Sequence, residues 1–303
     1  MSRPLLVVGS VAFDTIETRA GRREEILGGA AVYISLSASR FSPVRLVGVV
    51  GEGDFPDEHM RLLTSRGVDV EGLERRPGET MRWSGVYAED FSTRTTLETR
   101  LGVFERFDPT IPPAYTDSGL LMLGNIDPGL QLRVLDQVSD DCFVATDTMN
   151  LWIDTARDEL EKVIARTDLL VINDEESFQL TAEPQVAVAA EKILSMGPRY
   201  LVIKRGEHGA LLFGDETLFF APAFPLREVV DPTGAGDCFA GALMGYLAAG
   251  GEIDGGRIRR GMIYGAAVAS TGAEGFGTER VAKLERDHVD RRHDELRELV
   301  SID

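Results

Sequence analysis

The segment Asp231–Asp237 (DPTGAGD) holds the residues best suited to chemistry. Its two glycines let the backbone approach a bound group closely, so that successive N–H groups can form an anion-binding nest. The small and apolar residues 238–249 predict a helix, whose N-terminus directs the positive end of its dipole at the same point. The segment therefore predicts an anion site, above all one for phosphate.

Asp237 is a carboxylate at this site, where it would repel phosphate unless it serves the reaction. Phosphoryl transfer needs a group close to the γ-phosphate that accepts the proton of the attacking hydroxyl. Asp237 fits that role, and the helix dipole is expected to keep it ionised. The alternative is that Asp237 is only the N-cap of the helix. The chain has neither a P-loop signature (Gly, four residues, Gly-Lys-Ser/Thr) nor a protein-kinase catalytic-loop pattern.

The whole heptapeptide resembles the second signature of the ribokinase-like, or phosphofructokinase-B (PfkB), family of carbohydrate and nucleoside kinases. The resemblance implies that Asp237 is the catalytic base. It also implies that Gly234, Ala235 and Gly236 form the hole for the transferring phosphoryl group, with Thr233 and Gly236 beside the nucleotide. The expected reaction is transfer of the γ-phosphate of ATP, with Mg²⁺, to a hydroxyl group of a small molecule.

The resemblance extends to the N-terminal part of the chain. Asp14 ends the segment GSVAFD, where the family carries a loop Asp that binds substrate hydroxyls, and a carboxylate can accept from two of them. The alternative is a turn Asp that caps its own backbone. Gly28 and Gly29 match the substrate loop of the family, but Tyr33 stands where Asn is common, which leaves the substrate open. Asn125, in GNID, is a further substrate-binding candidate.

Two strand-end segments hold the candidates for nucleotide binding. Asn173 and Glu176 resemble the NxxE motif of the family, in which the Glu organises Mg²⁺ through water. This suits Mg²⁺, which keeps its waters and uses few protein ligands. The alternative is an acidic cluster at a helix N-terminus. In KRGEHG, Lys204 or Arg205 could offset the charge of ATP, with Gly206 near the nucleotide.

Weaker resemblances lie in three other segments. Residues 268–277 stand where the family shapes its adenine pocket and often binds a monovalent cation such as K⁺. Asp147 and Asn150, in DTMN, resemble a family position between the two substrates, although the spacing differs by one residue. Trp83 is the better of the two tryptophans for stacking on a base or sugar face.

Short apolar runs alternate with helical patterns along most of the chain, which predicts βαβ units and a parallel sheet covered on both faces. Strands are expected at 5–8, 44–50, 120–123, 142–146, 169–172 and 200–204, with extra strands within 210–230. Helices are expected at 30–40, 59–66, 130–138, 153–165, 186–196, 238–249, 261–270 and 279–299.

Residues 80–104 are rich in Thr, aromatic and β-branched residues and predict strands outside the parallel core. The resemblance implies one α/β kinase domain over residues 1–303, with a three-layer α/β/α ribokinase-like core, a mainly parallel sheet and a small β-strand lid. The lid is expected to form from about 12–27 and 80–104 and to exclude water, the competing phosphate acceptor. A homodimer through the lid is also implied.

Composition limits the partners. The 303 residues carry a formal net charge of −18, which repels nucleic acid and anionic membranes. No apolar run reaches the roughly 18 residues of a membrane span, and the first run is too short for a signal peptide. The two cysteines, Cys142 and Cys238, form no disulfide framework or metal-ligand cluster. A cytoplasmic enzyme acting on a small molecule is expected.

Several functions stay open within these limits. A sugar or sugar acid is slightly favoured as substrate, and a ribonucleoside such as adenosine is the alternative, since Trp83, Tyr87 and Phe91 could stack on a base. A non-catalytic sugar or nucleotide sensor is disfavoured by Asp237, because a sensor needs no base. A Rossmann dehydrogenase is disfavoured because the Gly9 region lacks the GxGxxG pattern.

Overall fold

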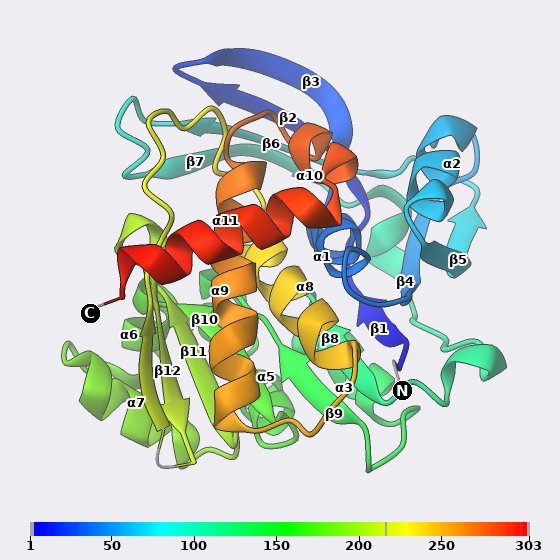
Figure 1. Ribbon diagram of the computed structural model, residues 1–303. Helices are drawn as coiled ribbons and strands as arrows, with labels where there is room; N and C mark the ends of the chain where they lie inside the picture. The colour runs from blue at the N-terminus through cyan, green and yellow to red at the C-terminus, as the bar shows by residue number, and fades with distance from the viewer. Residues whose placement is uncertain (1–2, 216, 302–303) are drawn as a thin grey trace.

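The computed structural model describes residues 3–215 and 217–301, and its centre is a nine-stranded sheet (Figure 1). Across the sheet the strand order is β13-β12-β11-β10-β9-β8-β1-β4-β5. The strands from β11 to β5 run parallel, and β12 and β13 continue the edge as an antiparallel pair. The bounds are β1 (Leu5–Val8), β4 (Val44–Gly51), β5 (Val68–Arg76), β8 (Leu120–Leu123), β9 (Phe143–Thr146), β10 (Leu169–Asn173), β11 (Tyr200–Lys204), β12 (Ala210–Gly214) and β13 (Thr217–Ala221).

Helices cover both faces of this sheet, as the continuous apolar strands require. In β1, Leu5 and Val7 face one apolar core while Leu6 and Val8 face another. The first face carries α1 (Ala30–Ala38), α2 (Asp57–Ser65), α8 (Ala235–Ala248), α9 (Gly255–Gly272), α10 (Glu279–Lys283) and α11 (Arg286–Leu299). The second carries α3 (Pro128–Leu135), α4 (Asn150–Thr155), α5 (Arg157–Ile164), α6 (Asp174–Thr181) and α7 (Val186–Leu194). The predicted three-layer α/β/α core is confirmed.

A second, four-stranded sheet lies across one end of the central sheet (Figure 1). Its order is β3-β2-β6-β7, with β2 parallel to β6 and the two other pairs antiparallel. The bounds are β2 (Ala12–Thr18), β3 (Gly21–Gly28), β6 (Met81–Tyr87) and β7 (Arg94–Arg100). All seven residues of β7 are exposed, so this sheet presents one open edge to solvent.

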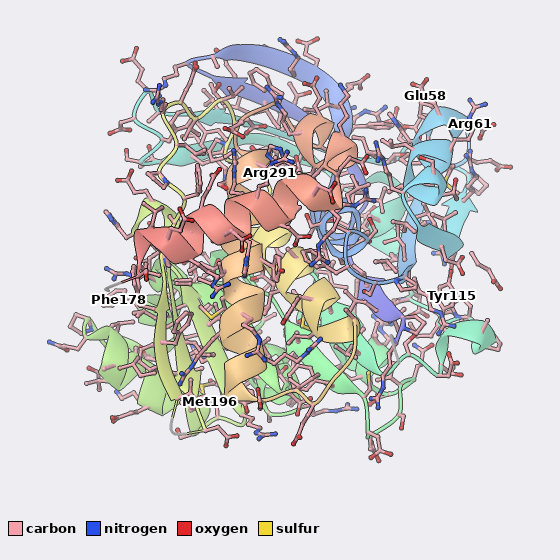
Figure 2. All side chains as sticks on the ribbon, in the orientation of Figure 1. Glu58, Arg61, Tyr115, Phe178, Met196 and Arg291 are labelled. Carbon is pink, nitrogen blue, oxygen red and sulfur yellow. The ribbon has the colours of Figure 1, made fainter. Side chains whose placement is uncertain are left out.

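Charged side chains lie on the outside of the fold. Figure 2 shows Glu58 and Arg61 on the outer face of α2 and Arg291 on that of α11. Both cysteines have buried, free thiols. None of the helices that the structure describes has the length and apolar character that crossing a membrane requires.

Several elements differ from the sequence predictions. Asp14 lies within β2 and not in a loop, because β2 pairs with β3 and β6 on its two sides. The strand β5 was not predicted, because its five charged residues obscure the strand pattern. Its position at the sheet edge leaves three of those five exposed to solvent. The expected strands within 210–230 end at Ala221.

Helix boundaries also differ. The helix expected at 153–165 is divided at Ala156, whose backbone (φ −139°, ψ 41°) ends α4 and begins α5. The helix expected at 279–299 is divided at Leu284 and Glu285, which are extended. Helix α9 begins at Gly255, earlier than expected, because the Asp254 side chain caps it by accepting from the Arg257 N–H at 2.6 Å.

Helix α8 lies directly against the backbone of α1, and two glycines allow this approach. A Cβ on Gly241 would lie 2.7 Å from the Cα of Ile34, and one on Gly245 would lie 2.6 Å from the Cα of Ala38. Real Cβ atoms do not approach backbone so closely. The contact therefore fixes the N-terminus of α8 beside that of α1, where the two predicted binding segments lie.

We expect Gly241→Ala to lower the free energy of unfolding by about 2 kcal/mol, because the added methyl group must separate the two helices. The matched control is Gly256→Ala, an exposed position in α9 where an added Cβ would lie 3.4 Å from Oδ1 of Asp254, an ordinary contact distance. That change should raise stability by up to about 1 kcal/mol through helix propensity. Urea unfolding measures both, and equal stabilities would contradict the close packing.

Candidate active site

The loop before α8 is shaped by one buried carboxylate. Asp231 accepts from the N–H of Thr233 at 2.9 Å and from the N–H of Gly277 at 2.8 Å. Gly234, the N-cap of α8, has φ +72°, and a Cβ there would lie 2.5 Å from the Tyr33 ring. Both its conformation and its close contact thus require glycine. The N–H of Ala235, the first residue of α8, donates to the Pro232 carbonyl at 3.1 Å. The N–H groups that follow it in the first turn have no carbonyl partner within the helix, so they are the ones open to an anion.

Asp237 stands in the first turn of α8 and is half-buried. It is not the N-cap, because Gly234 occupies that position and no side chain caps the helix. Burial raises the pKa of Asp237 to about 7, Asp147 raises it as well, and Lys204 and Arg94 lower it. Burial therefore opposes the ionisation that the helix dipole favours, and a pKa of about 7 leaves Asp237 protonated in part of the molecules at neutral pH.

Three neighbouring strands bring further charged groups to the same edge. Lys204 at the end of β11 places its Nζ 3.2 Å from Oδ2 of Asp147, the first residue after Thr146 in β9. Burial lowers the pKa of Lys204, but Asp147, Glu176 and Asp237 raise it above its usual range. The carboxyl ends of adjacent parallel strands meet at one edge of a sheet, which explains how residues far apart in sequence gather here.

Asn173 and Glu176 form a capping box at the start of α6. The Asn173 side chain accepts from the Glu176 N–H, and the Glu176 side chain accepts from the Asn173 N–H, both at 2.8 Å. The contacts of Asn173 and Glu176 in this structure are therefore those of the alternative interpretation, in which these residues only form the N-terminus of a helix. Burial raises the pKa of Glu176 to about 7, and Lys204 lowers it. In the part of the chain that the structure describes, no three His, Cys, Asp or Glu side chains are arranged to hold a metal directly, so Mg²⁺ would need waters and phosphate oxygens as ligands.

Beside this loop lies Asp14, where the sequence predicts the substrate-binding pocket, and the charges of Asp231 and Asp237 are near enough to raise its pKa. Its carboxyl is 5% exposed, and a Cβ on Gly28 would overlap it, so Gly28 gives it room. Gly29 has φ +89°, and a Cβ there would lie 2.5 Å from the carbonyl oxygen of Ser10. Burial raises the pKa of Asp14 from 3.8 to about 7, while the Gly29 N–H lowers it.

Tyr33 connects this pocket to the anion loop. It is 2% exposed, its ring lies against Gly234, and its hydroxyl is near enough to the Asp14 carboxyl to lower that group's pKa. Within residues 3–215 and 217–301 its oxygen makes no hydrogen bond of normal geometry. A buried hydroxyl without a partner is costly, so this side chain is poised for a polar group from a bound molecule.

The second sheet contacts the loop through Tyr87, whose hydroxyl lies 3.0 Å from Oγ1 of Thr233. Beside it, the guanidinium of Arg94 lies 5.4 Å from the centroid of Trp83, whose indole covers Gly85. These side chains are thus packed along the sheet in this structure.

Other predicted residues have different surroundings. Asn125 accepts from Nε1 of Trp152 at 2.9 Å, so its amide is engaged by α4. Gly206 has φ +53° in a short 3₁₀ turn with open space around it, and Arg205 lies 3.9 Å from Asp174. Asp231 was not singled out as a site residue. Asp147 had only a weak resemblance, although its place directly after a strand, like that of Asn173 in β10 and Lys204 in β11, could have ranked it higher.

We expect Asp14→Asn to raise the free energy of unfolding at pH 8 by up to about 4 kcal/mol, because ionising a buried carboxyl with a raised pKa costs stability. The gain should disappear below about pH 4, where the wild-type carboxyl is protonated in both folded and unfolded chains. Urea unfolding across this pH range measures it, with the exposed Glu89→Gln as control. A variant less stable than wild type at pH 8 would contradict this account of Asp14.

Several known kinases are similar to this chain in sequence. A model of the pfkB family of carbohydrate kinases matches residues 3–283. The chain is 32% identical to a cytidine kinase of Thermococcus kodakarensis, covering 82% of this chain and 90% of the relative. It is 28% identical to a nucleoside kinase of Methanothermobacter thermautotrophicus (91% of each) and 25% identical to a ribokinase of Bacillus subtilis (90% and 95%).

Solved structures show the same fold. A putative ribokinase II from E. coli in complex with ATP and Mg²⁺ has a TM-score of 0.81 at 19% identity, covering 97% of this chain and 100% of that one. A nucleoside kinase of Burkholderia thailandensis in complex with inosine also has a TM-score of 0.81, at 20% identity and coverage of 96% and 97%. At these identities the likeness establishes the ribokinase-like fold alone.

Proposed function

The chain belongs to the pfkB family of carbohydrate kinases, and we propose that it phosphorylates a ribonucleoside with ATP. It is thus a phosphotransferase with an alcohol group as acceptor. The observation that carries the proposal is the position of Asp237 between two differently charged regions. Asp14 lies near enough to Asp237 for that charge to raise its pKa, and the ammonium of Lys204 lies near enough to Asp237 to lower the pKa of Asp237. The two relatives with the highest identity reported above are a cytidine kinase and a nucleoside kinase, which favours a nucleoside over a free sugar.

In the proposed mechanism, Asp14 accepts hydrogen bonds from acceptor hydroxyls, and the Gly28–Gly29 backbone lies against the sugar. Tyr33 offers its hydroxyl to the same molecule. Asp237 takes the proton of the attacking hydroxyl while the oxygen of that hydroxyl forms a bond to the γ-phosphorus. The bond from that phosphorus to the β,γ-bridging oxygen breaks, and its electron pair leaves with ADP. The N–H groups of Gly234 and Gly236 stabilise the charge on the transferring group, and that of Ala235 joins them only by giving up its bond to the Pro232 carbonyl.

On the nucleotide side, Lys204 offsets phosphate charge, and Thr233 and Gly206 lie beside the nucleotide. The Asn173–Glu176 pair would orient waters of Mg²⁺, and when bound this ion neutralises charge on the phosphates. The second sheet would act as a lid, since Tyr87 already contacts Thr233. Closure would remove water that competes with the acceptor hydroxyl.

We expect Asp237→Asn to lower kcat by about 10³-fold, because the amide cannot accept the hydroxyl proton. Nucleotide affinity should change little, since the backbone N–H groups remain. ADP production with ATP–Mg²⁺ measures kcat, and calorimetric titration measures nucleotide binding. Turnover like that of the wild type would overturn the role of Asp237 as base.

We expect kcat/KM to rise with pH through about 7, because Asp237 accepts a proton only when ionised and its pKa is about 7. Glu176 titrates in the same range, so the observed midpoint belongs to the group as a whole. The rise should be smaller in the residual activity of Asp237→Asn, in which only Asp14 and Glu176 still titrate in this range. A flat wild-type profile over this range would contradict the assignment.

A panel of acceptors distinguishes nucleoside from sugar. For a nucleoside kinase, kcat/KM for the preferred ribonucleoside should exceed that for ribose by roughly 10²-fold, because contacts with the base contribute binding energy to the transition state. A free sugar kinase is the second candidate, favoured by the ribokinase relative that matches 90% of the chain. Ribose turned over faster than every nucleoside would establish that second candidate.

A further inference from the structure

The ammonium of Lys204 is held in one place by Asp147. Its Nζ lies 3.2 Å from one carboxylate oxygen and 3.4 Å from the other, so it is shared between both. The two side chains are only 17% and 7% exposed. The same ammonium lies 3.1 Å from the point that a Cβ on Gly236 would occupy, so it stands directly over the first turn of α8.

Asp147 itself is rigidly placed. Its N–H donates to the carbonyl of Leu123 at 2.9 Å, and its own carbonyl accepts from Nε2 of the fully buried Gln131 at 3.1 Å. One carboxylate oxygen also accepts from the Thr148 N–H at 2.9 Å. The carboxylate therefore has little freedom to move, unlike an ion pair between two flexible surface side chains.

We propose that Asp147 is a positioning residue that holds the Lys204 ammonium over the first turn of α8, where it meets the phosphates of ATP. This rests on the proposed kinase function. Lysine has a long, flexible side chain, so a fixed partner is needed to direct its charge at one point. Asp147 also determines which carboxylate the ammonium pairs with, because Glu176 and Asp237 lie near enough to affect the pKa of Lys204 as well. Without Asp147, Lys204 would pair with Asp237 and occupy the base that the reaction needs.

The test is a double-mutant cycle with Asp147→Asn, Lys204→Met and the double variant. We expect Lys204→Met to lower kcat/KM for ATP by roughly 10²-fold or more, and Asp147→Asn by about 10-fold or more, through misplacement of the same charge. Because Asp147 acts through Lys204, the double variant should be no worse than Lys204→Met. KM for the acceptor should stay within about twofold in all three, a pattern that general damage to the fold would not give.

Two outcomes of the double-mutant cycle overturn the proposal. One is an Asp147→Asn variant with unchanged kcat/KM for ATP, and the other is a double variant whose loss equals the product of the single losses. Asp168→Asn is the matched control for burial, since Asp168 accepts from the Val144 N–H at 2.8 Å just before β10, at the end of the strand opposite Asn173. It should alter the melting temperature and leave kcat/KM for ATP unchanged, and an equal loss there would also overturn the proposal.

Binding of ATP–Mg²⁺, measured by calorimetry on the same variants, separates this proposal from the proposed function. Non-additive losses of nucleotide affinity in a protein that phosphorylates no acceptor would support the role of Asp147 and remove the kinase function. Additive losses in an active kinase would remove the role of Asp147 and leave the kinase function intact. The double variant removes the Asp147 and Lys204 charges together, so neither of these two is left buried without the other, and the protein should remain folded.

Discussion

The direct contact between the backbones of α1 and α8 is the constraint on which the site depends. Gly241 and Gly245 allow it, and no larger residue fits at either position. Because the two helices cannot slide apart, Gly29 at the start of α1 and Gly234 at the start of α8 stay in fixed relation, joined by the ring of Tyr33. The pocket and the anion loop are thereby parts of one rigid unit.

The buried carboxyl groups of this unit lower the stability of the folded chain. Burial raises the pKa values of Asp14, Glu176 and Asp237 to about 7, so each carboxylate is costly to ionise where it stands. Carboxyl groups with a pKa near 7 can take up and release protons at neutral pH, and they are typical of functional sites. The cation that balances them, Lys204, is itself drawn by several carboxylates, so its placement requires a dedicated partner.

Much of the architecture could be predicted from local pattern, and the interactions within the site could not. Leu5–Val8 and Tyr200–Lys204 are short, wholly apolar or nearly so, and both were placed correctly as strands. The pairing of Asp147 with Lys204 joins residues 57 positions apart, which no local pattern encodes. The protonation of Asp237 likewise depends on burial by the whole fold. The predicted roles of the site residues stay predictions.

The attachment of the second sheet has a consequence for synthesis of the chain. Thr18 donates to the carbonyl of Val230, 212 positions away, and Thr278 donates to that of Leu27, 251 positions away. Residues made first are thus anchored by residues made last. While the ribosome is still extending the chain, the strands of the second sheet can pair with one another, but the sheet lacks these two bonds to the rest of the fold until the final third emerges.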